Sequence, residues 1–396
     1  MQEILTVNEL FSGIGAQRKA LERLGIAHEV IGVCEIDKYA IQSYEAIFGK
    51  TKNYGDICTT PRLDYADLWT YSFPCQDISV AGNQKGINEN TRSGLLYQVQ
   101  RLLEVAKHEK TLPKYLLLEN VKNLVGKKFK EQFFEWVYYL EELGYDTYWQ
   151  VLNAKHYGIP QNRERVFAIS IRKDLNQTFE FPKPEELTKR LKDVLEDEVD
   201  EKYYLPQDKV QSLIKTLENK EISNTIRAGG RGSLDRHQWD LVAIGASCGR
   251  NPENPSDRTV GAPTEQRLEI NTQGTSNTIT TVQKDNYVVE SKIIELGHYP
   301  YPNSDKKHQS NTVYSSDGLC PTLDTMQGGN RQPKILSDDI RIRKLTPLEC
   351  WRLMGFDDED FNKAQQSGVS NSQLYKQAGN SIVVNVLEKI FENLYK

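Results

Sequence analysis

The sequence predicts an α/β protein in which a doubly wound sheet with helices on both faces is joined to a smaller, loop-rich and mostly β domain. Two observations predict this fold class. From residue 4 to residue 172, apolar runs of strand length alternate with stretches of helical periodicity, a pattern typical of a parallel sheet covered by helices. After Phe181 a Pro-containing acidic linker begins, and residues 221–335 are rich in Gly, Ser, Thr, Asn and Asp with only short apolar runs.

The elements of the first part follow from these patterns in chain order. The predicted strands are apolar runs at residues 4–11, 29–36, 66–73, 114–121 and 165–172. The predicted helices carry apolar residues at three- and four-residue steps, which places those residues on one helix face. They cover residues 16–24, 37–48, 95–106 and 129–143.

Helical signals return after Arg341. Thr346 followed by Pro347 predicts a helix start, because Thr is a good N-cap and Pro is favoured at the first helical position. A last helix is predicted from Asn380 onward. We therefore expect a first domain at 1–180, a linker and a second domain at 181–340, and a C-terminal segment at 341–396 that returns to the first domain.

The composition is that of an ordinary folded protein, with 38% hydrophobic and 27% charged residues among 396. No apolar run reaches the roughly 18 residues of a membrane helix, and the first ten residues lack the pattern of a secretory signal, so we expect a cytoplasmic protein. The six cysteines form no Cys-x-x-Cys pair, so no metal site is predicted. Residues 183–201 hold four Lys/Arg and eight Asp/Glu, which supplies −4 of the net charge of −5 and leaves the rest nearly neutral.

Three features at successive strand ends indicate a nucleoside pocket. Phe11-Ser-Gly-Ile-Gly15 is a glycine turn that brings backbone and a helix N-terminus close to a ligand, although without the third glycine of the dinucleotide fingerprint it also fits a plain strand-to-helix turn. Glu35 ends the second strand, where a carboxylate accepts both hydroxyls of a ribose. Asp56 follows as an acceptor for an adenine amino group. Each carboxylate alone fits a helix cap or a solvated charge, but their order favours the nucleoside interpretation.

Cys75 and Glu119 are the candidate reactive groups. Cys75 lies in Tyr71-Ser-Phe-Pro-Cys75-Gln76, at the carboxyl end of a strand where ligands bind in open α/β sheets. Most free cysteines are buried and inert, but this one follows a rigid Pro beside the predicted pocket. Glu119 ends the apolar strand before Asn120, where an unpaired buried carboxylate is costly. Arg163 and Arg165, in Gln-x-Arg-x-Arg, bring two guanidinium groups to the same edge, with structural salt bridging as the alternative.

These motifs occur in one order along the whole chain, and they end with Gly379-Asn380-Ser381. In this order the chain resembles a cytosine carbon-5 DNA methyltransferase of the bacterial and phage type. That family places its variable target-recognition region between Gln-x-Arg-x-Arg and a late Arg-Leu-Thr-type segment, here Arg343-Lys-Leu-Thr, and the composition of this chain changes within that interval.

The resemblance implies the fold of S-adenosyl-L-methionine-dependent methyltransferases, with S-adenosyl-L-homocysteine as the product and no metal. It implies that one set of residues lines the cofactor pocket: Phe11, Gly13, Gly15, Glu35, Ile36, Asp56, Ile57, Asn380 and Ser381. It also implies double-stranded DNA as the partner, a monomeric enzyme, and, in some members, a cognate restriction endonuclease that acts on the same site. The protein is then bacterial or phage-encoded and nucleoid-associated through DNA.

The implied mechanism follows from the low nucleophilicity of carbon 5 of cytosine. Addition of the Cys75 thiolate at carbon 6 makes carbon 5 the nucleophilic carbon of an enamine, which attacks the methyl sulfonium. Glu119 protonates N3 and Arg165 stabilises charge at O2, with Arg163 as a further catalytic candidate. The base that removes the carbon-5 proton stays open, with water as a candidate. Because these atoms are buried in duplex DNA, the cytosine is expected to rotate into a cleft between the two domains.

The DNA contacts depend on less specific signals. Gln76, Lys85 and Arg92, in or beside the loop 76–94, are candidates for holding the backbone around the extruded nucleotide, as is Arg163. The recognition region contains a repeat, in which residues 274–286 match residues 318–330 and residues 223–230 form a partial third copy. One interpretation is a repeated strand and turn of a sheet. The other is that its polar flanks contact DNA; they are Arg227, Arg231, Lys284, Asn286, Asn330 and Arg331.

Two rival functions remain open at this stage. A transfer-RNA cytosine-5 methyltransferase shares the Pro-Cys-Gln and Glu-Asn-Val motifs, although the long repeat-bearing insertion favours DNA readout. A catalytically silent DNA-binding protein on the same fold has no need of Cys75, Glu119 and Arg165 together. An amino-methylating enzyme is set aside, because this sequence lacks the Asp/Asn/Ser-Pro-Pro-aromatic loop.

Overall fold

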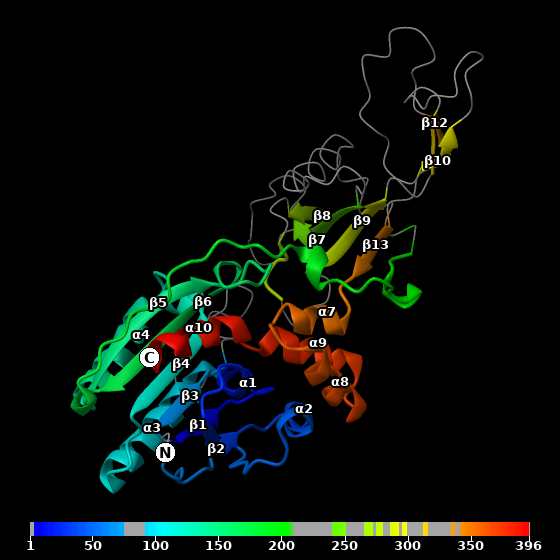
Figure 1. Cartoon of the computed structure of the whole chain (residues 1–396). Coiled ribbons are helices and arrows are strands. Elements are labelled where there is room, and N and C mark those ends of the chain that lie inside the picture. The colour runs from blue at the N-terminus through cyan, green and yellow to red at the C-terminus, as the bar shows by residue number, and fades with distance from the viewer. Residues whose placement is uncertain are drawn as a thin grey trace. The chain divides into compact units, whose positions relative to one another are not determined.

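The structure is a computed structural model (Figure 1). It describes residues 4–74, 92–206, 208, 240–250, 265–271, 275–279, 286–292, 295–298, 312–315, 334–336 and 341–395. By its internal contacts the chain divides into two compact units. Unit 1 comprises Met1–Lys189, Thr278–Thr281 and Pro347–Lys396, and unit 2 comprises Arg190–Asn277 and Val282–Thr346.

Unit 1 is built on a six-stranded sheet with the order β2-β1-β3-β4-β6-β5. Its strands are β1 (Leu5–Leu10), β2 (His28–Cys34), β3 (Leu68–Tyr71), β4 (Tyr115–Val121), β5 (Tyr145–Asn153) and β6 (Glu164–Arg172). The five predicted strands are confirmed, and β5 is an additional one. The first four strands of the order are parallel, whereas β6 is antiparallel to both of its neighbours.

The prediction of a wholly parallel sheet is therefore wrong at β6. A parallel neighbour requires a long crossover, but only residues 154–163 separate β5 from β6, so the chain turns back and pairs in the opposite direction. Strand β5 escaped prediction because it is an edge strand whose residues are mostly half-buried or exposed, and its sequence holds no continuous apolar run.

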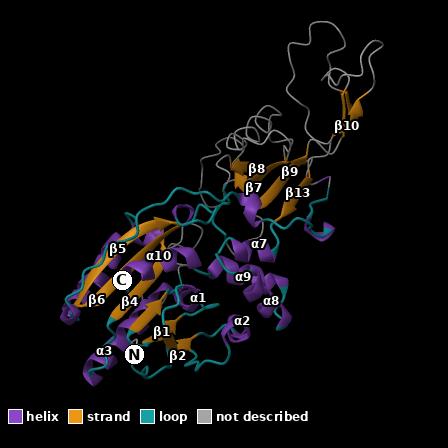
Figure 2. Ribbon diagram, viewed as in Figure 1, coloured by secondary structure: helices purple, strands orange, loops and turns teal. Residues whose placement is uncertain are grey.

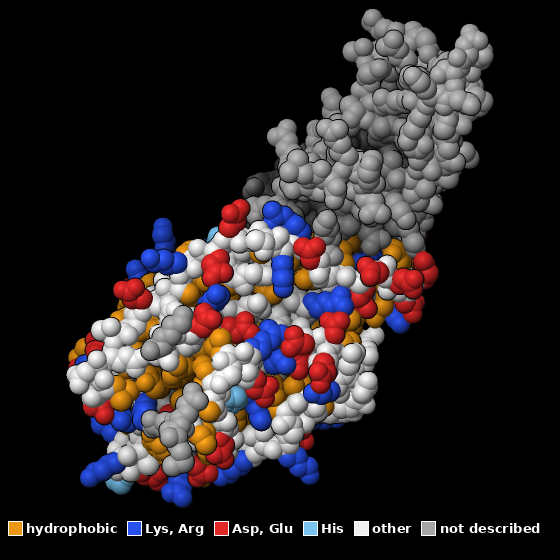
Figure 3. Space-filling view, in the orientation of Figure 1, with side chains coloured by type: hydrophobic (Ala, Val, Ile, Leu, Met, Phe, Trp, Pro, Cys, Tyr) orange, Lys and Arg blue, Asp and Glu red, His pale blue; other side chains and the backbone are white. Residues whose placement is uncertain are grey.

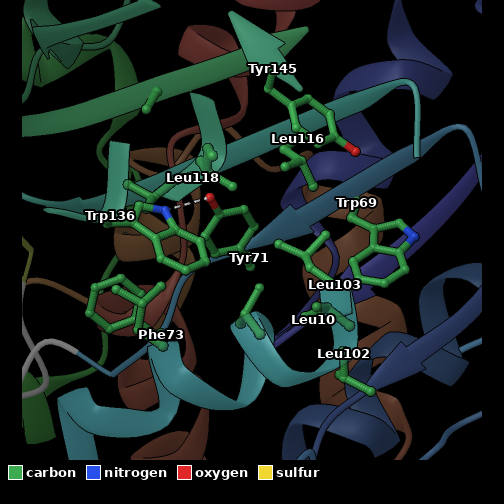
Figure 4. Close-up of a cluster of buried hydrophobic side chains, with 14 of the residues drawn as sticks. Leu10, Trp69, Tyr71, Phe73, Leu102, Leu103, Leu116, Leu118, Trp136 and Tyr145 are labelled. Atoms are coloured by element: carbon green, nitrogen blue, oxygen red, sulfur yellow. Dashed lines mark hydrogen bonds between the residues drawn. The ribbon is translucent and has the colours of Figure 1, made fainter. Parts of the chain in front are cut away.

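Helices cover the sheet on both faces (Figure 2). Side chains of α3 (Leu96–Glu109) and α4 (Lys130–Glu142) pack with Tyr71 and Leu118 in one buried cluster. Figure 4 shows this cluster, in which Trp136 Nε1 donates to the Tyr71 hydroxyl at 3.1 Å. The opposite face carries α1 (Ala16–Arg23) and α2 (Lys38–Phe48), and α10 (Val384–Leu394) packs against α1.

The C-terminal part of unit 1 holds α7 (Pro347–Arg352), α8 (Asp358–Gln366), α9 (Asn371–Asn380) and α10. The predicted helix start at Pro347 is confirmed. The prediction of one last helix from Asn380 onward is wrong, because Asn380 ends α9 and α10 begins only at Val384. Ser381 and Val383 have extended backbone between the two helices. Ile382 and Val383 are nevertheless buried, which is why they prolong the apolar pattern of α10.

Unit 2 is mostly β in the residues described. One sheet has the order β13-β9-β7-β8, and a second has the order β10-β11-β12. The strands are β7 (Asp240–Arg250), β8 (Glu265–Asn271), β9 (Tyr287–Lys292), β10 (Glu295–His298), β11 (Thr312–Ser315), β12 (Lys334–Leu336) and β13 (Arg341–Lys344). In the first copy of the repeat, residues 275–279 belong to no named strand. The other two copies lie outside the described residues.

Short 3-10 helices connect several elements. They are η1 (Arg92–Leu95), η2 (Lys122–Val125), η3 (Ala154–His156), η4 (Lys173–Leu175), η5 (Leu191–Val194) and η6 (Glu201–Tyr203). Among the described residues, no helix combines the length and the apolar character needed to cross a lipid bilayer.

Candidate active site

A cavity of about 310 Å³ lies in unit 1 where the parallel strands end, which is the edge where open α/β sheets bind ligands. Its volume is within the range of small-molecule sites. The cavity brings together most of the residues predicted from the sequence: Phe11, Gly13, Glu35, Ile36, Asp56, Ile57, Glu119, Arg163, Arg165, Asn380 and Ser381. Gly15 is not among its lining residues.

The glycine turn between β1 and α1 has an unusual backbone. Phe11, Gly13 and Gly15 all have positive φ, at 59°, 55° and 79°. Gly15 is the N-cap of α1, and a Cβ atom there would lie 2.5 Å from Cε2 of Phe48 and 2.7 Å from Cε2 of Tyr44. A side chain at position 15 would therefore push the turn away from α2. Gly15 therefore affects the cavity through the path of the turn, because it does not line the cavity itself.

Glu35 connects the glycine turn to the end of β2. Its carboxylate accepts backbone N–H groups from Gly13, Ile36 and Asp37, each at 2.9 Å. A carboxylate has about four lone-pair positions, so acceptor capacity remains for a ligand hydroxyl. Ile36, the next residue, is 72% exposed although it is a large apolar side chain that lines the cavity. An apolar surface and a carboxylate thus stand side by side.

Asp56 and Ile57 form a second such pair. Oδ1 of Asp56 accepts the backbone N–H of Cys58 at 2.9 Å, which closes a tight turn and fixes the side chain. The residue is exposed, whereas Ile57 beside it is buried. Both line the cavity. The arrangement offers one polar acceptor next to an apolar wall.

Glu119 and Arg165 form an ion pair on the other side of the cavity. Arg165 Nε lies 3.3 Å from Glu119 Oε1, and the Glu119 residue is only 7% exposed. Burial raises the pKa of the Glu119 carboxyl, while the positive charges of Arg165 and Arg163 oppose that rise. The balance favours a carboxyl that holds a proton more readily than an exposed glutamate does.

Asn120 is a residue that the sequence analysis did not single out as functional. Its Nδ2 donates to the carbonyl of Phe73 at 3.0 Å, and this contact is buried. Ser72, Phe73 and Pro74 line the cavity, and Cys75 is the next residue in the sequence. Asn120 therefore anchors the segment that leads to Cys75. The available signal was its position directly after Glu119, near the end of β4.

Arg163 has partners that differ from the predicted ones. It is 4% exposed, and its guanidinium donates to the backbone carbonyls of Ile279, Gly379 and Ser381 at 2.6, 3.1 and 2.7 Å. Three carbonyl partners favour a structural role in shaping the edge of the cavity over direct contact with a base or a phosphate.

Asn380 and Ser381 contribute the C-terminal edge of the cavity together with Lys376 and Gln377, which the sequence analysis missed. Lys376 Nζ lies 2.7 Å from Asp37 Oδ2, and Gln377 Nε2 donates to the carbonyl of Tyr39 at 2.8 Å. These two contacts attach α9 to the start of α2. Both residues read as ordinary helix surface in the sequence, because their partners are remote.

Several predicted residues lie outside the described residues: Cys75, Gln76, Lys85, Arg227, Arg231, Lys284, Asn330 and Arg331. Arg92 begins η1, but its side chain also lies outside the description. Asn286, a predicted DNA contact, is buried, and its Oδ1 accepts the backbone N–H of Asn277 at 3.0 Å. The structure thus gives Asn286 a role within unit 2.

The family model for C-5 cytosine-specific DNA methylases matches residues 5–396 of this chain. A curated relative, the orphan methyltransferase M.SPRI of Bacillus phage SPR, is 35% identical, and the match covers 98% of this chain and 97% of the relative. The type II methyltransferase M.HhaI of Haemophilus parahaemolyticus is 32% identical, with 98% and 93% covered.

Two solved structures share the fold. The Entamoeba histolytica methyltransferase EhMeth has a TM-score of 0.58 at 17% identity, covering 100% of this chain and 98% of that one. The S. pombe Dnmt2 methyltransferase has a TM-score of 0.53 at 20% identity, covering 98% and 97%. These similarities confirm the predicted methyltransferase fold. The match of the family model to residues 5–396 and the identities of 35% and 32% to the two relatives show that the chain belongs to the C-5 cytosine-specific DNA methylase family, the family and enzyme class predicted from its motifs.

Proposed function

We propose that this protein transfers the methyl group of S-adenosyl-L-methionine to carbon 5 of a cytosine rotated out of duplex DNA, with Cys75 as the covalent nucleophile. The observation that carries the proposal is the composition of one cavity. Its walls combine the nucleoside-type contacts of Glu35 and Asp56 with the Glu119–Arg165 ion pair and with Pro74, which immediately precedes Cys75.

The residues present fit the cofactor. Glu35 has acceptor capacity for the ribose hydroxyls, and exposed Asp56 for the adenine amino group. Ile36 offers an exposed apolar side chain to the adenine ring, which explains why so large a side chain is left uncovered. The positive-φ glycine turn at Gly13 keeps the backbone without a Cβ where the ligand approaches. When bound, S-adenosyl-L-methionine supplies an electrophilic methyl group.

The protein's own groups activate the cytosine. The Cys75 thiolate adds to carbon 6, and the electron pair of the carbon 5–carbon 6 double bond shifts to form a carbon 4–carbon 5 double bond. The electron pair of the carbon 4–N3 double bond takes up the proton of Glu119 at N3, which leaves an enamine with carbon 5 as its nucleophilic carbon. The raised pKa of Glu119 supports this role, because a general acid must hold its proton near neutral pH. Arg165 orients Glu119 and offers N–H donors to O2. After carbon 5 is methylated, a base removes its proton, the carbon 6–sulfur bond breaks to release the Cys75 thiolate, and N3 returns its proton to Glu119, which restores the aromatic ring.

Burial supports base rotation. Glu119 is 7% exposed at the end of β4, so a base that remains stacked in a duplex has no access to its carboxyl. An extruded nucleotide can enter the cavity, at the cost of the lost stacking.

DNA is the inferred partner because the chain belongs to a family of DNA methylases. On the face that Figure 3 shows, Lys and Arg are interspersed with Asp and Glu over the described residues. On this face, a basic tract does not identify the partner. We propose a monomer, as the resemblance to this family implies. The relatives include orphan and type II methyltransferases by name, so both a solitary enzyme and one paired with an endonuclease remain predictions for this chain.

Product analysis tests this proposal. The protein is incubated with S-adenosyl-L-methionine and mixed-sequence plasmid DNA, the DNA is digested to nucleosides, and 5-methylcytidine-type products are separated by mass spectrometry. We expect 5-methyldeoxycytidine from DNA and none from bulk transfer RNA. Methylation of transfer RNA alone would instead establish the RNA enzyme, and methylation of neither, with DNA still bound, would establish a silent binder.

A further inference from the structure

Arg163 joins two segments that are far apart in the sequence. It lies between β5 and β6 and is almost completely buried. Its Nη1 donates to the carbonyl of Ile279 at 2.6 Å, and its Nη2 donates to the carbonyls of Gly379 and Ser381 at 3.1 and 2.7 Å. The planar, multidonor guanidinium permits this bridge, which the single ammonium of a lysine does not reproduce.

The segment around Ile279 has further contacts with the same loop. Gln161 Oε1 accepts the backbone N–H of Ile279 at 2.8 Å, and Gln161 Nε2 donates to the carbonyl of Leu353 at 2.6 Å. Thr278 Oγ1 donates to the carbonyl of Asn162 at 2.8 Å. Ile279 is 3% exposed. Both backbone polar groups of Ile279 are thus paired with side chains of the β5–β6 loop.

The contact between Arg163 and Ile279 involves a segment that the chain enters from unit 2 and leaves to unit 2. Thr278–Thr281 belongs to unit 1, although the residues on both sides of it, up to Asn277 and from Val282, belong to unit 2. Gly379 and Ser381 line the cavity. One guanidinium therefore holds a segment that is covalently continuous with unit 2 and the C-terminal edge of the cavity at the same time.

We propose that Arg163 is a positioning residue that couples the C-terminal edge of the cavity to the Thr278–Thr281 segment. Ligand binding in the cavity then stabilises the segment, and displacement of the segment weakens ligand binding. Moving either set of carbonyls leaves a buried guanidinium short of acceptors, so the two sets are held as a unit. Such coupling is reciprocal. If the bound ligand stabilises the position of the segment by a given factor, displacement of the segment lowers the affinity for the ligand by the same factor. The identity of the ligand, S-adenosyl-L-homocysteine in the test below, rests on the proposed function.

Hydrogen exchange of the full chain, with and without saturating S-adenosyl-L-homocysteine, tests the coupling. In the wild type we expect the ligand to slow exchange of the Ile279 amide by about 5-fold or more, a typical lower bound for coupled sites. The amides of Gly13, Ile36 and Asp37, which bond to Glu35, should slow as well. In Arg163→Lys the ligand should still slow exchange at Gly13, Ile36 and Asp37, but it should no longer slow exchange at Ile279.

Arg172→Ala is the matched control. Arg172 lies at the other end of β6 and also donates to a backbone carbonyl, that of Leu112 at 2.7 Å, but does not line the cavity. In Arg172→Ala the ligand should slow exchange both at Ile279 and at the amides that bond to Glu35. A ligand effect at Ile279 that is as large in Arg163→Lys as in the wild type would overturn the coupling, and so would a wild-type effect confined to Gly13, Ile36 and Asp37.

A second variant guards against misfolding of the Arg163 variant. Thr278→Ala removes one hydrogen bond of the segment, and Thr278 does not line the cavity. We expect it to weaken S-adenosyl-L-homocysteine binding about 3-fold, the equivalent of one ordinary hydrogen bond. Unchanged affinity would count against the coupling. No slowing anywhere in the wild type would overturn both the coupling and the proposed cofactor, whereas slowing at Gly13 without Ile279 overturns the coupling alone.

Discussion

Arg165 Nε lies 3.3 Å from Glu119 Oε1, and the two residues come from neighbouring strands that run in opposite directions. The register pairs Val121 at the end of β4 with Arg165 near the start of β6. In an all-parallel sheet, the first residues of a strand would lie at the edge opposite to the strand ends. The reversal of β6 is therefore what brings the cation to the carboxyl.

Glu119→Gln should lower kcat for DNA methylation by about 10²- to 10⁴-fold, the usual contribution of a general acid, because glutamine has no proton to deliver at N3. Affinity for S-adenosyl-L-homocysteine, measured by calorimetry, should stay unchanged. The control is Glu164→Gln, at an exposed carboxylate of β6 that pairs with Lys122 at 2.8 Å. A Glu119→Gln enzyme with wild-type kcat would rule out the assigned acid.

Arg165→Gln should change the pH profile as well as the rate. Burial raises the pKa of Glu119, and the charge of Arg165 opposes the rise, so its removal raises that pKa further. Because the protonated form is active, activity is lost as pH rises through this pKa, and the loss should move to higher pH in the variant. Rates measured across the pH interval in which wild-type activity falls test this expectation. Arg172→Gln should keep the wild-type profile, and a shift of Arg165→Gln to lower pH would contradict the account.

Glu9 gives the folded protein a predictable pH dependence of stability. This buried carboxyl accepts from the Arg18 backbone N–H at 3.0 Å and the Tyr44 hydroxyl at 2.6 Å, and burial raises its pKa from 4.5 to about 7. Since the folded pKa is the higher one, its stabilising contribution is complete below the unfolded pKa and is lost as pH rises to about 7. The total is on the order of 3 kcal/mol.

Glu9→Gln keeps the shape of the neutral carboxyl and should remove this pH dependence. The free energies of unfolding in urea at about pH 5 and about pH 8 should then differ by less than they do in the wild type. Glu45→Gln, at an exposed position of α2, should keep the wild-type difference. Equal pH dependence in Glu9→Gln and wild type would show that Glu9 is not the titrating group.

Gly15→Ala should be far more damaging than Gly25→Ala, although both glycines flank α1 and have positive φ. An alanine Cβ at position 15 meets the Phe48 and Tyr44 rings, whereas at position 25 nothing lies within 4 Å. We expect a loss of about 3 kcal/mol at position 15, from backbone strain and overpacking, and about 1 kcal/mol at position 25. Thermal or urea unfolding measures both. Equal losses would show that the packing of the turn on α2 does not matter.

Most of the architecture was predictable because periodicity reports burial directly. The parallel strands β3 and β4 are mostly apolar and buried, and Leu102, Leu103 and Ala106 mark the buried face of α3. Strand β5 and the direction of β6 were not predictable in this way. Periodicity carries no information on strand direction, and an edge strand such as Tyr145–Asn153 shows no apolar run.

The site divides along a similar line. Glu35, Glu119 and Arg165 could be named from the sequence because a charged side chain at a strand end stands out against apolar neighbours. Arg163 and Asn286 were assigned to chemistry or DNA, but both are buried among backbone partners that arrive from elsewhere in the chain. Such partners, like the carbonyls of Gly379 and Ser381, have no signature in side-chain types.

The central claim, covalent attack by Cys75, is tested most directly with mixed-sequence DNA that contains 5-fluorocytosine. Fluorine at carbon 5 does not leave as a proton does, so the cysteine adduct persists through denaturing gel electrophoresis. We expect a shifted band that depends on S-adenosyl-L-methionine for the wild type and for Cys58→Ser, which removes an exposed free thiol next to Ile57. We expect no shifted band for Cys75→Ser. A shifted band of equal intensity from Cys75→Ser, or none from a wild-type protein that methylates ordinary DNA, would contradict the claim.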